Sequence, residues 1–203
     1  MKLDSIKEVN NEGRPHYRLG DAILRPIHNN SAAEDALDPK YKDTIAQDYL
    51  LTRIKGTGSK IDILKAIIED HIKRKEYPVP DPGELVIHFR IGDFKRVDKI
   101  SIIYWLLRMV KKSKAKKVTI VTAMHAVASH VNDPASYGLL PSFIDELDKN
   151  RISYSIKSGE IDEDFCYMVK AKKFIATNGN FSRLAYLCCD GKKLSSRKHA
   201  RIS

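Results

Sequence analysis

From residue 84 onward, short apolar runs alternate with longer stretches that have helical spacing. Apolar and β-branched runs predict strands at residues 85–89, 117–122, 152–156 and 173–177. Apolar positions three and four residues apart predict helices at residues 97–111, 139–149, 162–171 and 181–189. Strands that alternate with helices are typical of a parallel sheet with right-handed connections. We therefore expect an α/β fold with a parallel, Rossmann-like sheet.

Two of these predicted helices have a clear apolar face. In the first, the face is formed by Ile100, Ile103, Tyr104, Leu107 and Val110. In the last, it is formed by Phe181, Leu184, Ala185 and Cys188.

The first eighty residues have a different pattern. Residues 59–75 predict a helix that Ser59 caps, and residues 33–51 predict a partly helical segment. Residues 77–83 contain three prolines and a glycine, which marks a boundary. We expect a reduced, mainly helical region at residues 1–80 and a nucleotide-binding sheet domain at residues 81–203. The basic tail after Asp190 is predicted to be loose.

Composition limits the classes of partner. The 203 residues carry a formal net charge of +10, which favours nucleic acid, a membrane surface or a phosphate-bearing small molecule. No run of eighteen apolar residues predicts a membrane-spanning helix, and the N-terminus is too polar for a secretory signal. We expect a cytoplasmic protein or a soluble fragment of a longer one.

The three cysteines, Cys166, Cys188 and Cys189, fit that compartment. Two of them are adjacent, and none has the spacing of zinc ligands. They are predicted to be reduced thiols in the core.

Candidate chemistry first gathers where the strand at 85–89 ends. His88, Arg90, Gly92 and Asp93 crowd into six residues, and ligands bind at the carboxyl ends of strands in open α/β sheets. Arginine offers a planar fork that matches phosphate, and glycine lets a backbone approach a ligand closely. A salt bridge between Arg90 and Asp93 at a tight turn is the purely structural alternative. The grouping favours a binding site.

A second segment, residues 171–189, is predicted to form a strand, a turn and a helix. The turn contains Asn178 and Asn180, and the helix that follows begins near Ser182 and Arg183. The N–H groups at the start of a helix form a natural anion site. An ordinary helix cap by Asn or Ser is the alternative that needs no ligand.

The pattern H-x-R-x-G-D at residues 88–93 resembles the first signature of a fucosyltransferase superfamily. That superfamily includes the alpha-1,2-, alpha-1,6- and protein O-fucosyltransferases, which use GDP-fucose and have a GT-B type fold. The segment at 178–183 resembles the late motif of the same superfamily. The resemblance implies that Arg90 contacts the donor pyrophosphate, that His88 lies near the nucleoside and that Ser182 supplies a hydroxyl beside the phosphates. Gly92, Asn178, Asn180 and Arg183 complete the donor site that it implies.

The implied reaction is transfer of a sugar from a GDP-sugar to an acceptor hydroxyl, such as that of a glycan, without a metal or other cofactor. Asp93 and Asp21 are the candidate catalytic carboxylates beside Arg90. Asp93 is expected to be a poor base, because an adjacent arginine lowers the pKa of an aspartate. The eighty N-terminal residues depart from the acceptor-binding Rossmann half of a full GT-B enzyme. The strand end at residues 122–125 also lacks the acidic residue that reads guanine in the superfamily.

Two alternatives remain open. The chain could be a nucleotide-sugar-binding module without activity, or a basic nucleic-acid-binding protein. The lysine-rich segment at residues 111–117 has no interleaved aromatic residue to stack on bases, so it is expected to be a solvated loop. The glycine-rich residues 56–60 lack a preceding strand, and they predict a turn before the Ser59 helix rather than a phosphate-binding loop.

Overall fold

The computed structural model describes residues 8–10, 39, 42–55, 59–90, 99–122, 124–126, 138–177 and 179–194. Its main sheet has five parallel strands in the order β5-β3-β2-β6-β7. The strands are β2 (Leu85–His88), β3 (Lys117–Val121), β5 (Ser153–Lys157), β6 (Lys173–Ala176) and β7 (Lys192–Lys193). This is a Rossmann-like arrangement, and it confirms the predicted parallel α/β sheet.

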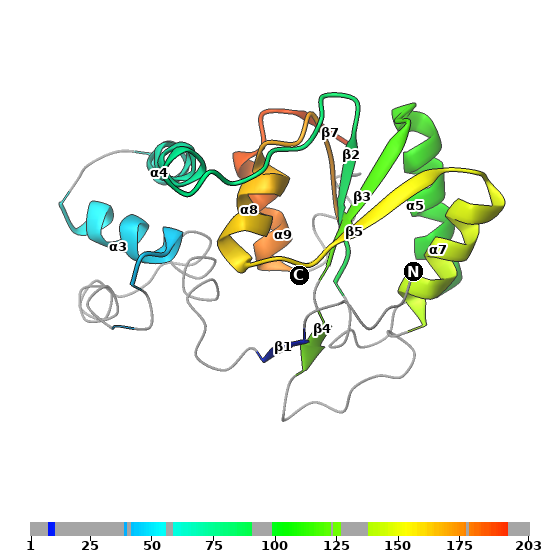
Figure 1. The fold of residues 1–203 in the computed structure, drawn as a ribbon, viewed down its shortest axis with the longest axis horizontal. Coiled ribbons are helices and arrows are strands. Elements are labelled where there is room, and N and C mark those ends of the chain that lie inside the picture. Colours follow the sequence, from blue (N-terminus) through cyan, green and yellow to red (C-terminus); the bar gives the residue numbers. More distant parts are fainter. Residues whose placement is uncertain are drawn as a thin grey trace.

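Two pairs of helices cover the two faces of the sheet (Figure 1). One face is covered by α5 (Lys99–Ser113) and α7 (Leu139–Lys149). The other is covered by α8 (Ile161–Val169) and α9 (Asn180–Cys188). Successive side chains of a strand point to opposite faces of the sheet. Leu85 and Ile87 of β2 therefore pack in the core beneath α5 and α7, whereas Val86 packs in the core beneath α8 and α9.

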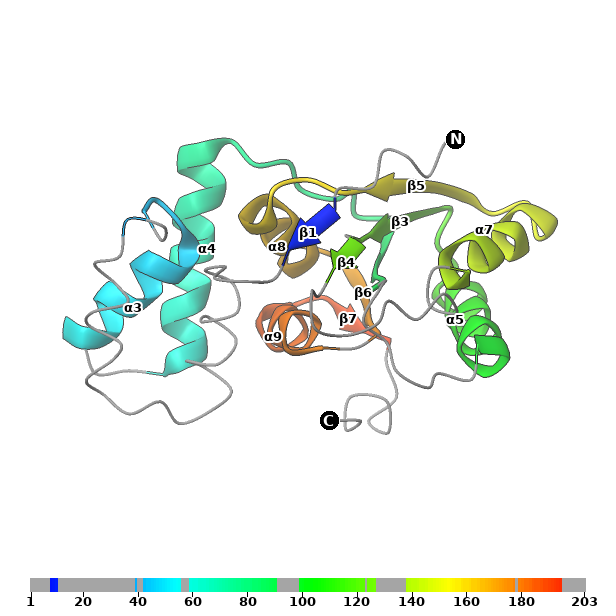
Figure 2. The ribbon, with the colours of Figure 1, turned by 90° about the horizontal axis from the view of Figure 1, so that it is seen from below.

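The described N-terminal helices form a further layer outside α8 and α9 (Figure 2). They are α3 (Ile45–Lys55) and α4 (Lys60–Lys75), and α4 packs against both α8 and α9. Ile45, Leu64 and Ile68 are fully buried in the same hydrophobic cluster as Phe165 and Cys188. The helical region and the sheet therefore share a core.

Two small features of the sheet differ from the sequence expectations. The tail after Asp190 was predicted to be loose, yet Lys192 and Lys193 form β7 and Leu194 is buried. The backbone N–H groups of Lys192 and Leu194 donate to the carbonyls of Lys172 and Phe174 at 2.8 and 3.0 Å. In addition, β1 (Glu8–Asn10) pairs in parallel with β4 (Met124–Ala126) outside the main sheet.

The cysteines agree with the sequence prediction. Cys166, Cys188 and Cys189 are all free thiols and all buried. Burial raises the pKa of the thiols of Cys166 and Cys188 to about 12. Such thiols are unreactive packing groups. In the part of the chain that the structure describes, no helix is both long and apolar enough to cross a membrane.

Candidate functional site

The two sequence motifs meet at one edge of the sheet. β2 and β6 are hydrogen-bonded neighbours, with His88 opposite Ala176 at their carboxyl ends. The chain moves from β2 outward through β3 to β5, and then crosses back to β6 on the other side of β2. The boundary between β2 and β6 is therefore the topological switch point, where open α/β sheets bind their ligands.

Arg90 and Gly179 lie in contact across this switch point. A Cβ atom added to Gly179 would lie 2.6 Å from Nη1 of Arg90, which is closer than real Cβ contacts. Gly179 also has a φ of +89°, which side chains other than hydrogen rarely adopt. The half-buried guanidinium group therefore crosses the backbone just before α9, where only glycine leaves room for it.

The first turn of α9 begins at a glycine. Gly179 occupies the N-cap position, and no side-chain cap bond is formed there. Arg183 N donates to Gly179 O at 3.0 Å, and the N–H groups before it in the first turn lie ahead of the hydrogen bonds within the helix, as at any helix start. The N-cap residue itself therefore forms no Asn or Ser cap, and Asn178, which could form one, lies outside the described residues.

The electrostatics of this corner favour negative charge. The start of α9 carries a partial positive charge of about half an elementary charge, and the Arg90 guanidinium group adds a full one beside it. Arg183 is exposed in the same first turn. An anion placed beside these groups would interact favourably with each of them.

Two of the predicted donor-binding side chains are buried. His88 lies beneath α9, where its ring packs edge-on against Phe181 with centroids 5.8 Å apart. Ser182 is fully buried, and its hydroxyl has no hydrogen-bond partner among the residues that the structure describes. Arg90, Asn180 and Arg183 are the predicted side chains that reach the surface. Backbone N–H groups and Arg90 are thus the donors that the geometry offers to a ligand.

Hydroxyl groups hold the two strand ends together, which the sequence reasoning missed. Thr177 Oγ1 donates to the carbonyl oxygen of His88 at 2.7 Å, and Thr122 Oγ1 donates to that of Phe89. Phe89 N also donates to Val121 O at 2.9 Å, which extends the pairing beyond β2. These bonds fix the backbone from which Arg90 projects. The sequence signal for these bonds is a threonine directly after each of β3 and β6, the two strands that flank β2.

A charged pair at the end of β5 was also missed. Lys157 ends β5 and contacts Glu163 and Asp164 of the first turn of α8, with 3.4 Å between Lys157 Nζ and Asp164 Oδ1. Asp164 also accepts a hydrogen bond from Gly159 N at 2.9 Å. Burial raises the pKa of Asp164 to about 6, against the opposing effects of that bond and of Lys157. This carboxyl group could exchange a proton near neutral pH.

The remaining predicted residues lie outside the described part of the chain. They are Asp21, Gly92, Asp93 and Asn178. The roles suggested for them, including both candidate carboxylates, stay predictions.

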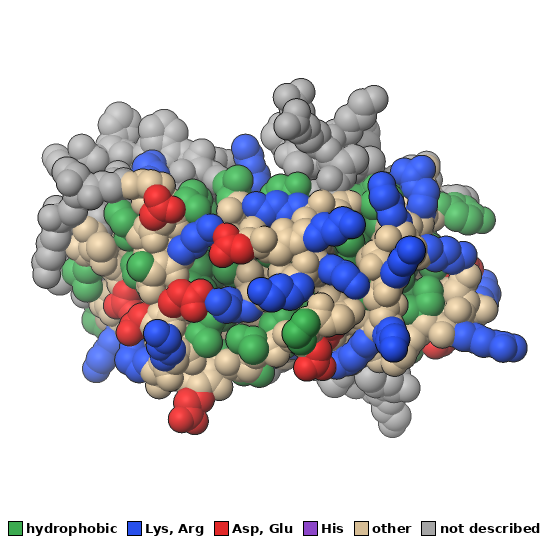
Figure 3. Space-filling model, turned by 90° about the horizontal axis from the view of Figure 1, so that it is seen from above, with side chains coloured by type: hydrophobic (Ala, Val, Ile, Leu, Met, Phe, Trp, Pro, Cys, Tyr) green, Lys and Arg blue, Asp and Glu red, His purple; other side chains and the backbone are tan. Residues whose placement is uncertain are grey.

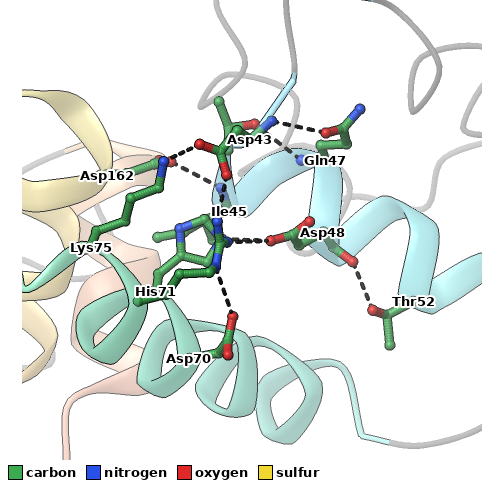
Figure 4. Close-up of polar contacts among 11 residues, drawn as sticks. Asp43, Ile45, Gln47, Asp48, Thr52, Asp70, His71, Lys75 and Asp162 are labelled. Atoms are coloured by element: carbon green, nitrogen blue, oxygen red, sulfur yellow. Dashed lines mark hydrogen bonds and ion pairs between the residues drawn. The ribbon is translucent and has the colours of Figure 1, made fainter.

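A second polar cluster lies between α3, α4 and α8, away from the switch point (Figure 4). His71 is fully buried on α4, and its Nε2 lies 2.6 Å from Oδ2 of Asp48 on α3. Asp48 also accepts from Arg74 at 3.3 Å, and Asp162 on α8 accepts from Ile45 N at 2.9 Å. Each drawn carboxylate has a basic or N–H partner, so the cluster clamps the three helices together.

The same cluster contains an exposed carboxyl group whose pKa is strongly lowered. Hydrogen bonds from Lys75 and Arg74 lower the pKa of Asp43 to about 2. Asp43 precedes α3, and both cations lie in the last turn of α4. The pairing ties the start of one helix to the end of the other.

Within the described residues, no group of three His, Cys, Asp or Glu side chains is arranged to hold a metal ion. Searches against protein-family models, curated proteins and solved structures found no match for the chain.

Proposed function

We propose that the chain binds a nucleoside diphosphate sugar, with GDP as the first nucleotide to test, at the switch point between β2 and β6. The observation that carries the proposal is the Arg90 guanidinium group crossing Gly179 at the start of α9. A bidentate cation and a set of converging N–H groups suit a pyrophosphate better than a single carboxylate. The resemblance of both motifs to the fucosyltransferase superfamily supplies the sugar-nucleotide class.

The proposed reaction is transfer of the sugar to an acceptor hydroxyl. The bond between the sugar's anomeric carbon and the diphosphate oxygen breaks, and a bond from that carbon to the acceptor oxygen forms. The acceptor proton passes to a base, and the nucleoside diphosphate leaves with the bonding electrons. Arg90 and the N–H groups of α9 would stabilise the charge that builds on the leaving diphosphate, without a metal ion.

The base for this reaction has three candidates. Asp93 and Asp21 remain the candidates from the motif and from the N-terminal region. Asp164 is a third, because its pKa of about 6 suits proton exchange near neutral pH. It lies in the first turn of α8 and contacts Lys157 at the end of β5, and β5 is two strands from β2, roughly 10 Å across the sheet.

A donor-binding module without transferase activity is the second candidate. The observation that favours it is the character of the N-terminal region. Among the described residues before β2, the structure has the helices α3 and α4 and the short strand β1. A GT-B enzyme would use a second Rossmann-like half to hold the acceptor. Binding of GDP without turnover of any GDP-sugar would favour this candidate.

The test is thermal unfolding with GDP, GMP, UDP and inorganic pyrophosphate, followed by titration calorimetry of those that stabilise. Ligand at a hundredfold over its Kd should add about 2.7 kcal/mol to the free energy of unfolding. The diphosphates should stabilise more than GMP, because the proposed site contacts two phosphates. No stabilisation by any nucleoside diphosphate would exclude the proposed site.

Substitution of Arg90 identifies its role. Arg90→Lys keeps the charge but loses the bidentate fork, so Kd for GDP should rise at least tenfold while the melting temperature stays near that of the parent. Arg108→Lys, at an exposed position on α5, is the matched control and should change neither value. Unchanged affinity in Arg90→Lys would show that the arginine only supports the local structure.

Transfer itself is tested by GDP release from GDP-fucose with and without an acceptor panel. EDTA should leave the rate unchanged, because the proposed stabilisation of the diphosphate comes from protein groups. Loss of activity in EDTA that Mg²⁺ or Mn²⁺ restores would contradict the metal-free mechanism.

A further inference from the structure

The opposite edge of the sheet, at the amino ends of the strands, carries a dense group of cations. Because all five strands are parallel, each helix that covers the sheet ends at this edge and is followed by a loop into the next strand. These helix ends and loops form what we call the lysine face. Its cations are Lys111, Lys112, Lys114, Lys116, Lys117, Lys149, Arg151, Lys170, Lys172, Lys173, Lys192 and Lys193. Figure 3 shows lysine and arginine side chains spread widely over this face.

Neighbouring carboxylates balance little of this charge. The lysine face contains three ion pairs among the described residues: Lys117 with Glu84 at 3.7 Å, Lys149 with Glu146 at 2.7 Å, and Lys170 with Glu69 at 2.6 Å. Lys193 lies over the ring of Tyr186. The other cations of the face have no carboxylate partner in the described part of the chain.

Helix dipoles do not account for the charge either. Lysines at a helix C-terminus do suit the negative end of the dipole, which is worth about half an elementary charge per helix. The C-termini of α5, α7, α8 and α9 therefore supply roughly two negative charges, against the nine cations of the lysine face that form no ion pair among the described residues. The surplus points to an anionic partner.

The composition of the face narrows the chemistry of that partner. Eleven of its twelve cations are lysine, a hydrated point charge, and one is arginine, whose fork serves directed recognition of phosphate and bases. Residues 111–117, 149–152, 170–173 and 189–193 contain no aromatic side chain on which bases could stack. A broad array of lysines without stacking groups suits a continuous anionic surface better than a single nucleic-acid strand.

An apolar projection borders the same edge. The segment that leads from α4 into β2 passes along this edge (Figure 1), and in it Val79 is 51% exposed between the exposed Pro78 and the buried Pro80. Pro82 is also exposed. A small apolar tip beside a basic field is the combination that binds the headgroup region of a lipid bilayer.

We propose that the lysine face docks the protein on an anionic membrane surface, such as one rich in phosphatidylserine. The face is about 20 Å wide across the five strands, so it can contact several headgroups at once. Docking in this orientation turns the carboxyl edge of the sheet, with Arg90 and the start of α9, away from the lipid. The proposal does not depend on the function of that edge.

The test is flotation with vesicles of phosphatidylcholine alone and with vesicles that contain equal parts of phosphatidylserine. Binding should require the anionic lipid and should fall steeply when salt is raised, because screening shortens the reach of the charges. Each lysine close to such a surface contributes about fivefold to the partition coefficient. The triple variant K116Q/K172Q/K192Q, with one change in each of three loops, should therefore bind roughly a hundredfold more weakly.

A second triple variant is the matched control. K42Q/K73Q/R108Q removes the same charge at exposed positions outside the loops of the lysine face, and it should lose much less affinity. Equal loss in both triple variants would reduce the effect to net charge and would overturn the proposal. Equal binding to neutral vesicles, or no binding to anionic vesicles, would also overturn the proposal.

Nucleic acid is the competing partner, and the same variants separate it from lipid. Duplex and single-stranded oligonucleotides should bind weakly and in a salt-dependent manner. If K116Q/K172Q/K192Q loses oligonucleotide affinity while vesicle binding is absent in the parent, the face is a nucleic-acid surface and the membrane proposal is wrong.

Discussion

At the scale of single residues, the decisive feature is the contact between Arg90 and Gly179. It combines a left-handed backbone conformation with a close approach that a Cβ atom would block. Such positions persist where the surrounding structure over-determines them, often at ligand sites. Gly179 therefore belongs to the candidate site, although the sequence reasoning assigned roles to its neighbours and not to the glycine itself.

Gly179→Ala should separate this role from ordinary loop structure. The methyl group must displace the Arg90 guanidinium group, and the positive φ costs roughly 1–3 kcal/mol in stability. Affinity for GDP should fall by more than tenfold, as measured by calorimetry on the folded variant. Gly83→Ala is the control, because a Cβ there meets nothing within 4 Å. GDP affinity equal to that of the parent in Gly179→Ala would contradict the proposed path of Arg90.

Asp164 makes a prediction about pH. Its folded pKa of about 6 lies above the ordinary 3.8, so the folded state holds the proton more tightly than the unfolded state. The contribution of this group to the free energy of unfolding is fully present below pH 4 and is lost as the pH rises through about 6. Asp164→Asn removes that loss and should be more stable than the parent above pH 6, by on the order of 3 kcal/mol.

Denaturation curves of parent and variant between pH 4 and pH 7.5 test this expectation. The difference in unfolding free energy should grow with pH over that window. Asp190→Asn should give a much smaller change of opposite sign, because Lys65 lowers the pKa of that exposed carboxyl group. A pH-independent difference for Asp164→Asn would mean that the carboxyl group is ionised in the folded protein throughout.

At the scale of elements, the sequence pattern predicted the central strands to within one or two residues. Strands β2, β3 and β6 are apolar and mostly buried, and a continuous apolar run is a strong signal. The two lysines of β7 carry no such signal, and the pairing of Lys192 and Leu194 with β6 exists only once the sheet has formed. Local pattern cannot reveal an edge strand of this kind.

Prediction of burial from the sequence pattern fails for some helix side chains. Tyr104 was assigned to the apolar face of α5, yet it is 68% exposed, and Trp105 is buried instead. A shift of one position along a helix turns a side chain by about 100°, and the apolar residues of α5 are too frequent to fix the face. Likewise His71 is fully buried because Asp48 of α3 reaches it, and pairing between helices has no local signature.

The same limit applies to the candidate site. The carboxyl ends of both strands were expected at one edge, because all strands of a parallel sheet share their direction. That β2 and β6 are neighbours depends on the crossover after β5, which sets the switch point. The sequence named Arg90 and Ser182 as candidates, whereas the burial of Ser182 depends on how α9 packs on the sheet.

Packing between elements also predicts how the chain unfolds. Leu64 of α4 is fully buried in the cluster shared with α8 and α9, so Leu64→Ala should cost about 2–5 kcal/mol. Because the core is shared, circular dichroism and tryptophan fluorescence should report one transition that shifts as a whole. Leu187→Ala, at a position 40% exposed on α9, is the control and should cost less than about 1 kcal/mol. Two separate transitions would instead support an independent helical domain at residues 1–80.

At the scale of the whole molecule, two groups of cations lie at opposite edges of one sheet. At the carboxyl edge, Arg90 and the start of α9 concentrate positive potential at one point. At the amino edge, the side chains of the lysine face spread positive charge over a wide surface (Figure 3). The length of the strands separates the two edges, and charges at such a distance interact weakly at physiological ionic strength.

This separation predicts that the two anion-binding activities are independent. K116Q/K172Q/K192Q should keep the parent's stabilisation by GDP, because none of its changes lies near Arg90 along the strands. Arg90→Lys should in turn keep the parent's affinity for anionic vesicles while it loses GDP. Each variant is measured in both assays at the same ionic strength, and coupling should stay within about twofold, or 0.4 kcal/mol. If GDP releases the parent protein from vesicles, or if either variant loses both activities, the two edges form a single anion site and the assignment of separate roles is wrong.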